Sequence, residues 1–265
     1  MTEETPPTIL VSTDERGVAT VTLNRPEIHN AFDDGVIRDL TGILFALGAD
    51  PAVKIVILAA AGPSFSAGAD LAWMRRMAGY TEAQNVGDAI ALARLLATLD
   101  GLSKPTIARV QGAAFAGGLG LISCCDIAVG AESAIFCVSE VKLGLVPATI
   151  SPYLVEAVGP RAARRYCLSA ERFSAAEAHR LGLLHEVVPG DQLDAALAKI
   201  VDNLLEGSLA AQRHTKELIA NVKDRPITDT LMLYTAQAIA DARASSDGKE
   251  GIAAFFEKRK PGWRR

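Results

Sequence analysis

The chain has 265 residues, of which 49% are hydrophobic and 22% are charged. This length and composition suit one large folded domain with an appendage and exclude an intrinsically disordered chain. The formal net charge of −4 gives no electrostatic reason to expect a nucleic-acid partner.

No targeting or membrane segment is predicted. The first seven residues are acidic and contain prolines, and they lack the basic and apolar regions of a signal peptide. The longest uncharged run, residues 110–125, is too short and too rich in glycine to span a membrane. We therefore expect a cytoplasmic protein that has no membrane partner.

The cysteines and histidines carry no metal signature. Neither type shows paired ligand spacing, so we expect buried, reduced thiols, histidines without a catalytic role, and no metal site. The residues concerned are Cys124, Cys125, Cys137 and Cys167, and His29, His179, His185 and His214.

The first predicted elements are a hairpin and a capped helix. Apolar, β-branched runs at residues 9–12 and 18–23 flank the polar stretch 14–17, which is a hairpin signal. Asp33 or Asp34 then caps a helix whose apolar side chains recur at helical spacing up to Leu47. A strand follows at 53–58, and a long helix at 81–99 ends before Pro105. Two more strands are predicted at 105–110 and 126–129.

The order of these elements predicts a two-part chain. The first two-thirds alternate strands and helices, as stacked ββα units do, which indicates an α/β fold. After Ser174 only helices are expected, with an interruption at 184–189. The stretch 193–257 is rich in Ala and Leu, and its apolar faces must pack on the core or on another subunit. We divide the chain into a core at 1–192 and a helical region at 193–265.

Two glycine-rich junctions carry the main functional signal. Residues 112–120 read Gly-Ala-Ala-Phe-Ala-Gly-Gly-Leu-Gly, and residues 64–71 read Ser-Phe-Ser-Ala-Gly-Ala-Asp-Leu. Glycines at strand-to-helix junctions let backbone N–H groups approach a ligand closely. Two such donors aimed at one oxygen make an oxyanion hole. The alternative is that these glycines only permit tight packing.

Glu140 is the predicted acid/base. It follows the run Phe-Cys-Val-Ser at 136–139 and begins a mostly apolar segment. Apolar neighbours disfavour the charged form of a carboxyl and raise its pKa toward a value useful in proton transfer. The alternative is a structural glutamate in the first turn of a helix, where the helix dipole favours it.

Five segments together resemble the enoyl-CoA hydratase/isomerase (crotonase) superfamily. They occur in family order at residues 24–32, 65–71, 112–126, 139–147 and 255–261. The resemblance implies a crotonase-type spiral of ββα units with a C-terminal helical trimerisation region, assembled as a homotrimer or a dimer of trimers. It also implies an acyl-CoA substrate, with no cofactor apart from that coenzyme A.

The resemblance assigns roles to particular residues. The backbone N–H groups of Ala67 and Gly117 would hold the thioester oxygen, with Glu140 as acid/base. It also implies contacts with CoA and substrate at Arg25, Ala69, Asp70, Leu71, Trp73, Gly120, Lys258 and Lys260. For some of these residues the alternative to ligand binding is a solvated surface charge or a packing role.

Gly120 departs from the hydratase pattern. Many hydratases carry a second glutamate at the aligned position, whereas the isomerases of the family work with one. The whole resemblance still favours an enoyl-CoA hydratase. Because of Gly120, an enoyl-CoA isomerase or a non-catalytic acyl-CoA-binding protein remain as alternatives. Several segments are similar to those of a bacterial subgroup described as methylglutaconyl-CoA hydratases of leucine breakdown, or relatives that act on branched isoprenoid acyl-CoAs. In that case the substrate carboxylate would orient water or pair with Arg75 or Arg76.

Overall fold

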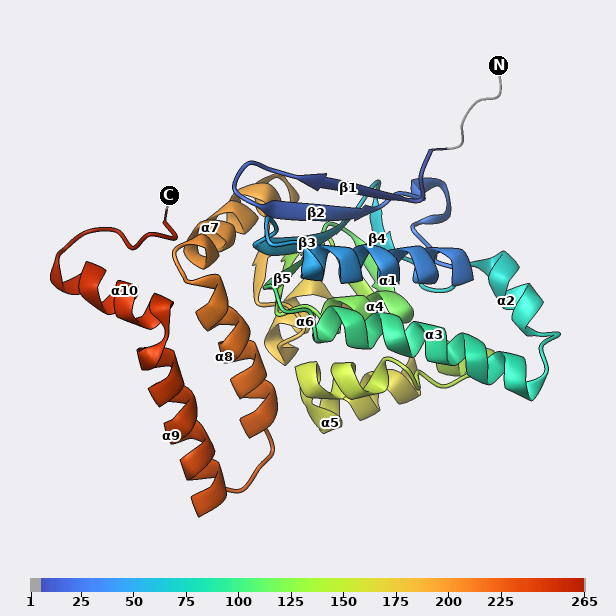
Figure 1. Ribbon diagram of the computed structural model, residues 1–265. Helices are drawn as coiled ribbons and strands as arrows, with labels where there is room; N and C mark the ends of the chain where they lie inside the picture. The colour runs from blue at the N-terminus through green and yellow to red at the C-terminus, as the bar shows by residue number, and fades with distance from the viewer. Residues whose placement is uncertain (1–5, 265) are drawn as a thin grey trace.

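The computed structural model describes residues 6–264 (Figure 1). The first five residues of the predicted core and Arg265 lie outside this range. Two β-sheets and the helices packed on them form the body, and three C-terminal helices extend from it. The α/β class predicted from the sequence is confirmed.

The larger sheet has six strands in the order β1-β2-β3-β5-β7-β10. The first pair is the predicted antiparallel hairpin, and the other neighbours run parallel. Its strands are β1 (Ile9–Thr13), β2 (Val18–Leu23), β3 (Ile55–Ala60), β5 (Thr106–Val110), β7 (Ile127–Ala131) and β10 (Glu186–Val188).

The smaller sheet has the order β4-β6-β8-β9 and is built from very short strands. They are β4 (Ser64–Ser66), β6 (Ala113–Phe115), β8 (Ile135–Cys137) and β9 (Phe173–Ser174). The sequence analysis did not predict these strands, because runs of two or three residues show no recognisable alternation. It also described β10 only as an interruption between helices. The long strands β3, β5 and β7 are each followed by a short one, β4, β6 and β8, which completes the ββα units.

Local capping signals mark the starts of α1 and α3. The Asp33 carboxylate accepts from the Val36 N–H at the start of α1, and Thr81 forms a capping box with Gln84 at the start of α3. The helices are α1 (Asp34–Ala49), α2 (Leu71–Met77), α3 (Glu82–Asp100), α4 (Gly117–Ser123), α5 (Ser151–Ser169), α6 (Ala175–Leu181), α7 (Leu193–Leu205), α8 (Leu209–Val222), α9 (Asp229–Ala244) and α10 (Ser246–Phe256).

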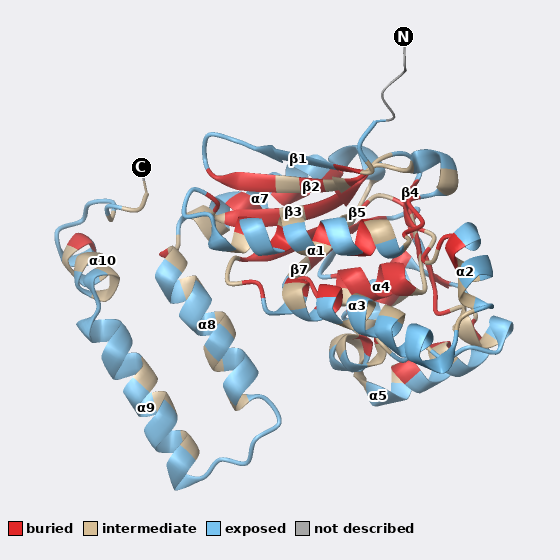
Figure 2. Cartoon of the chain, turned by 45° about the vertical axis from the view of Figure 1, so that its right-hand side comes forward, coloured by how far each residue is buried: buried red, intermediate tan, exposed pale blue. Residues whose placement is uncertain are grey.

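Both faces of the large sheet are covered by packed side chains. Side chains such as Val56 and Leu58 join Leu40 and Leu44 of α1 in the main core, whereas Ile55 and other residues pack with α7 in a second cluster. The short helix α4 lies inside the main core, and Figure 2 shows it almost entirely buried. Its glycines are therefore held between packed layers.

The C-terminal helices α8, α9 and α10 form an arm. None of the residues of α8 or α9 is buried, and Figure 2 shows both helices as exposed and intermediate surface. Because α7 packs on the sheet, we propose that the projecting region starts at Leu209 rather than at residue 193. The arm carries exposed apolar side chains at Ile219, Ile227, Met232, Leu233, Tyr234, Ile239, Ile252, Phe255 and Phe256.

Three of the four cysteines are buried as predicted, Cys167 is half-buried, and all four are free thiols. No helix in residues 6–264 is long and apolar enough to cross a membrane.

Candidate active site

The two glycine-rich junctions lie against each other. Gly68 has a φ of +87°, and a Cβ added there would lie 3.0 Å from the Phe115 carbonyl oxygen and 3.6 Å from the Gly117 nitrogen. Only glycine accommodates both this left-handed conformation and this close approach. The backbone after β4 therefore passes directly beside the N-terminus of α4.

The hydrogen bonds of this backbone correct one predicted donor. The Ala67 N–H donates to the His29 carbonyl oxygen at 2.9 Å, so it is not available to a substrate. The Gly68 N–H donates to the Ser66 hydroxyl and the Asp70 N–H to the Phe32 carbonyl. The Ala69 N–H lies between them and makes no hydrogen bond within residues 6–264. We therefore replace Ala67 by Ala69 as the proposed donor.

Gly117 supplies the second proposed donor. It is the first residue of α4, and the first N–H groups of a helix have no partner inside the helix. No acceptor for the Gly117 N–H lies in the described part of the chain. The positive end of the helix dipole adds to the field at this point. The two unpaired amides, at Ala69 and Gly117, thus belong to the two segments that lie against each other.

The residue before Gly117 is strained. Ala116 has φ 48° and ψ −118°, a conformation that disfavours any residue with a Cβ, and its N–H donates to the Cys137 carbonyl at 2.9 Å. That bond ties the start of α4 to the end of β8. Strain of this kind is typical of functional sites, because the surrounding structure holds the backbone in place.

Replacing Ala116 by glycine is expected to stabilise the protein by about 0.5–1 kcal/mol, because glycine adopts this conformation without strain. Denaturant unfolding measures the change. The control is Ala91→Gly in the exposed middle of α3, which should destabilise by about 1 kcal/mol. If both variants lose stability equally, Ala116 is not strained.

Glu140 starts the short 3-10 helix η2 (Glu140–Leu143), three residues after the Cys137 carbonyl that holds Ala116. Its Oε2 atom is buried and has no hydrogen-bond partner within residues 6–264. Burial raises the pKa of the carboxyl, against the lowering effect of the backbone N–H groups of Glu140 and Ser139. A buried carboxyl with a raised pKa and an unpaired oxygen suits proton transfer.

The position of a second carboxylate is filled by an apolar side chain. A Cβ at Gly120 would lie 2.4 Å from Cγ2 and 3.0 Å from Cβ of Ile150, and 3.4 Å from Cδ2 of Leu96. Ile150 is 2% exposed and is the N-cap residue of α5. Gly120 is therefore a packing position, and sequence reasoning missed Ile150 because thirty residues separate the two in the chain.

Arg25, a predicted CoA contact, is bound within the protein. Its guanidinium donates to the Ala31 carbonyl and to the carboxylates of Asp33 and Asp70, all at 3.1 Å. Asp70 also caps α2 through the N–H groups of Ala72 and Trp73. Burial would raise the pKa of Asp70, but these N–H groups and Arg25 lower it overall. With two carboxylates on one guanidinium, Arg25 offers no net positive charge to a phosphate.

The residues of α2 divide between core and surface. Trp73 is 4% exposed and its indole N–H donates to Asp88 at 3.2 Å, so its contacts support packing rather than CoA binding. Leu71 is 71% exposed at the start of the helix. Arg76 pairs with Asp34, whereas no ion pair of Arg75 is found in the described chain.

Within one chain, Lys258 and Lys260 lie apart from the other residues of the predicted site. Both are exposed and follow α10, which Figure 1 places on the opposite side of the molecule from α2. Arg259 between them pairs with Glu250 and Glu257. These lysines can serve a site like this one only across a subunit boundary.

The other polar groups have structural partners. Asp126 accepts from the Thr106 backbone and hydroxyl and from Lys216, which indicates a structural role. His29 contacts the Ser64 hydroxyl, and His185 accepts from the Ala128 N–H. No group of three potential metal ligands occurs within residues 6–264.

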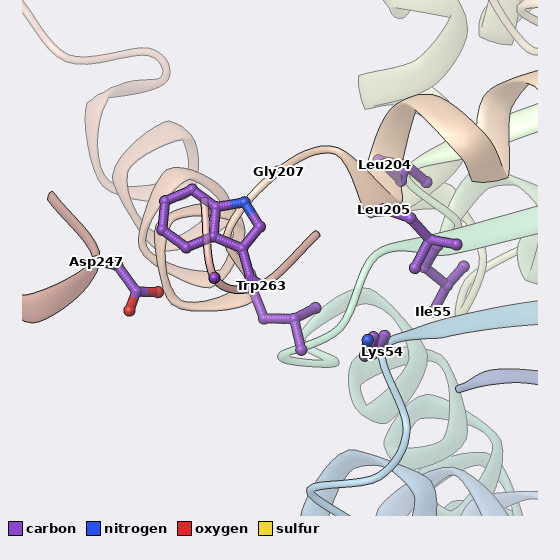
Figure 3. A pocket seen from close by; sticks show the side chains of 9 residues that line it. Lys54, Ile55, Leu204, Leu205, Gly207, Asp247 and Trp263 are labelled. Atoms are coloured by element: carbon purple, nitrogen blue, oxygen red, sulfur yellow. The ribbon is translucent and has the colours of Figure 1, made fainter. Parts of the chain in front are cut away.

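A separate pocket of about 400 Å³ lies at the base of the arm (Figure 3). It is lined by Leu204 and Leu205 from the end of α7, by Ile55, and by Trp263. The Trp263 indole N–H donates to the Glu206 carbonyl, and Asp247 accepts from the Ser208 hydroxyl. Lys54 and Asp247 are the charged residues of the lining, and the Asp247 carboxylate is already bonded to a hydroxyl.

The chain is similar to proteins of known family over nearly its whole length. A model of the family described as enoyl-CoA hydratase/isomerase matches residues 13–265. A Thermus thermophilus relative is 39% identical over 95% of this chain and 99% of its own. A crotonyl-CoA hydratase of Syntrophomonas wolfei is 34% identical over 93% of this chain and 94% of its own.

Solved structures give the same result. The crystal structure of an enoyl-CoA hydratase from Shewanella pealeana has a TM-score of 0.94 and 46% identity, covering 97% of this chain and 96% of its own. Pseudomonas aeruginosa AtuE has a TM-score of 0.91 and 34% identity, covering 98% and 100%. These neighbours confirm the fold class predicted from the sequence.

Proposed function

The chain belongs to the enoyl-CoA hydratase/isomerase family, and on that premise we propose that it adds water across the α,β double bond of an enoyl-CoA thioester. The observation that carries the proposal is the buried, unpaired carboxyl oxygen of Glu140, which follows by three residues the Cys137 carbonyl that holds Ala116 at the start of α4. No cofactor besides the coenzyme A of the substrate is part of the proposal.

The amides of Ala69 and Gly117 would stabilise the charge that develops in the reaction. When water attacks the β-carbon, the π electrons of the double bond move toward the thioester oxygen and form an enolate. Fixed N–H donors aimed at that oxygen stabilise the enolate more than the neutral thioester, which lowers the barrier. Removing one such donor typically lowers the rate by about 10²–10³-fold.

Glu140 would move the proton. Its carboxylate takes a proton from the attacking water as the new C–O bond forms, and the carboxylic acid then gives that proton to the α-carbon of the enolate. The carboxylate is regenerated, so one water is consumed and no other reactant is needed. A raised pKa favours this double role, because it brings the two protonation states closer in free energy near neutral pH.

The test is incubation with straight, branched and dicarboxylic enoyl-CoAs in oxygen-labelled water, followed by mass analysis of the products. A hydratase incorporates the label into a hydroxyacyl-CoA. An unlabelled product with a shifted double bond, or tight binding of acyl-CoA without turnover on any enoyl-CoA, would overturn the proposal.

The second candidate is an enoyl-CoA isomerase. The packing of Ile150 on Gly120 favours it, because this region then lacks the second carboxylate that polarises water in many hydratases. Glu140 alone can take a proton from one carbon and return it to another. The labelled-water experiment separates the two reactions.

We propose a branched or dicarboxylic acyl group, such as that of methylglutaconyl-CoA, as the preferred substrate. The similarity to the bacterial subgroup supports this choice, and the carboxylate of such a substrate would help to orient water where the protein has Gly120. Arg75 is the better-placed cation for it, because Arg76 pairs with Asp34.

Replacing Arg75 by alanine is expected to raise KM for methylglutaconyl-CoA about tenfold, because one charged contact with the substrate is lost. The kinetics with crotonyl-CoA, which lacks that carboxylate, should be unchanged. Arg38→Ala on α1, whose ion pair joins the neighbouring Asp39, is the matched control. Equal losses on both substrates would contradict the pairing.

The exposed apolar side chains of the arm support the proposal of a trimer or a dimer of trimers. In such an assembly the arm of one subunit packs on another, which buries Phe255 and Phe256. Lys258 and Lys260 would then reach the CoA phosphates of a neighbouring site. Analytical ultracentrifugation of the protein tests the assembly.

A further inference from the structure

Phe32 contacts both halves of the proposed oxyanion hole. It is 3% exposed and stands between the loop that follows β2 and the N-cap residue of α1. Its backbone pairs with the segment around Ala69, and its ring reaches the N-terminus of α4. None of the roles described above explains why one residue contacts both of these segments.

The backbone of Phe32 fixes the direction of the Ala69 amide. The Phe32 N–H donates to the Gly68 carbonyl at 2.8 Å, and its carbonyl accepts from the Asp70 N–H at 3.0 Å. These two bonds form a parallel bridge between Phe32 and Ala69. Because successive amides of an extended segment point to opposite edges, the bridge turns the Ala69 N–H away from Phe32 and leaves it unpaired.

The ring of Phe32 meets Gly117 with its tip. A Cβ added to Gly117 would lie 2.4 Å from the ring Cζ and 3.3 Å from both Cε atoms. The almost equal distances to the two Cε atoms mean that the ring points end-on at this position. The length of the Phe32 side chain therefore sets how closely the start of α4 approaches the Phe32 backbone.

Charged groups hold the Phe32 backbone in place. Arg25 bonds to Asp33, the next residue, and to Asp70, the residue after Ala69, while its third bond is to the Ala31 carbonyl. The two aspartates cap α1 and α2, so both helices and both sides of the bridge share one guanidinium. The segment that carries the ring is thus cross-linked on either side.

We propose that Phe32 is a positioning residue that sets the separation between the Ala69 and Gly117 amides. This inference rests on the proposed function, because it concerns the same thioester oxygen. A donor misplaced by about 1 Å loses much of its effect on an enolate, with rate losses of up to about 10²-fold. The inference also explains why residue 117 must be glycine, since any larger residue collides with the ring.

The experiment compares Phe32→Leu with Leu44→Ala, a core truncation on α1 remote from the glycine-rich junctions. The probe is butyryl-CoA, isotope-labelled at the carbonyl carbon, which binds but cannot be hydrated. Its thioester carbonyl stretch in the bound state reports polarisation by the two amides. Steady-state kinetics with crotonyl-CoA and thermal unfolding complete the measurement.

For Phe32→Leu we expect a loss of about 10–100-fold in kcat, a small change in KM, and a reduced carbonyl shift. Leu44→Ala should lose stability but keep the wild-type carbonyl shift. Gly117→Ala should be severely impaired alone, and adding Phe32→Leu should recover part of its activity, because the shorter side chain makes room for the methyl group.

A wild-type carbonyl shift in Phe32→Leu, or a rate loss that follows stability as in Leu44→Ala, would overturn the positioning role while the proposed function stands. An absent carbonyl shift and absent turnover in the wild-type protein would instead overturn the proposed function. The two failures are therefore distinguishable.

Discussion

Replacing Glu140 by glutamine is expected to lower kcat for enoyl-CoA hydration by about 10²–10⁴-fold, the usual contribution of a general acid/base. Glutamine keeps the size and hydrogen-bonding capacity of the side chain but cannot accept and return a proton. Acyl-CoA binding should be retained, because the oxyanion amides belong to the backbone. Stopped-flow or steady-state assays with crotonyl-CoA measure the loss.

The same variant should gain stability at neutral and alkaline pH. Burial raises the pKa of Glu140 above its ordinary value of 4.5, so folding favours the neutral form. The stability that the neutral form contributes is complete below the unfolded pKa and is lost as pH rises through the folded pKa. Glutamine has no charge to bury, so the difference in unfolding free energy between variant and wild type should grow with pH across that window.

Glu132→Gln, at an exposed position after β7, is the control for both measurements. It should leave kcat and the pH dependence of stability unchanged. Near-normal turnover by Glu140→Gln would remove Glu140 from the mechanism. A stability difference that does not change with pH would show that burial does not raise the pKa of Glu140.

Replacing Gly120 by glutamate, the residue of many hydratases, is expected to destabilise this protein by about 1–3 kcal/mol or more. Its Cβ would lie 2.4 Å from Ile150 Cγ2 and 3.0 Å from Ile150 Cβ, and rotation of the side chain cannot move Cβ away. A carboxylate placed against Leu96 and Ile150 also lacks a polar partner, which adds a desolvation cost. Denaturant unfolding measures the change.

Ile150→Ala should relieve the clash. Alone it leaves a cavity, but combined with Gly120→Glu it should cost less than the sum of the two single changes, because the removed carbons make room. Gly42→Glu is the control: nothing lies within 4 Å of a Cβ there, so glutamate should be neutral or stabilising in α1. Strictly additive costs at positions 120 and 150 would show that Ile150 does not exclude the second carboxylate.

The proposed donor pair illustrates why a motif alone was insufficient. Ala67 and Ala69 lie two residues apart in the same segment, and both are of the residue type expected in an oxyanion loop. Which amide is free depends on the His29 carbonyl, 38 residues before Ala67, and on the Phe32 bridge, 37 residues before Ala69. Only the hydrogen bonds of the folded backbone distinguish the two amides.

Local signals determined a large part of this protein from sequence. The Asp33 cap, the Thr81 capping box and the period of the buried side chains of α1 place helices correctly, because each depends on residues within a few positions. The glycine-rich junctions and Glu140, with the other segments of the resemblance, indicated the family for the same reason, because residue type and backbone conformation are local properties, and they predict Glu140 as the acid/base.

Tertiary structure decided what depends on distant contacts. The short strands of the second sheet exist only because neighbours pair with them, Arg25 is neutralised by aspartates from two other segments, and Ile150 occupies the space beside Gly120. The separation of the Ala69 and Gly117 amides is set by the Phe32 ring between them. Hydrogen-bond pairing, ion pairing and close packing join residues far apart in the chain, so no local pattern encodes their outcome.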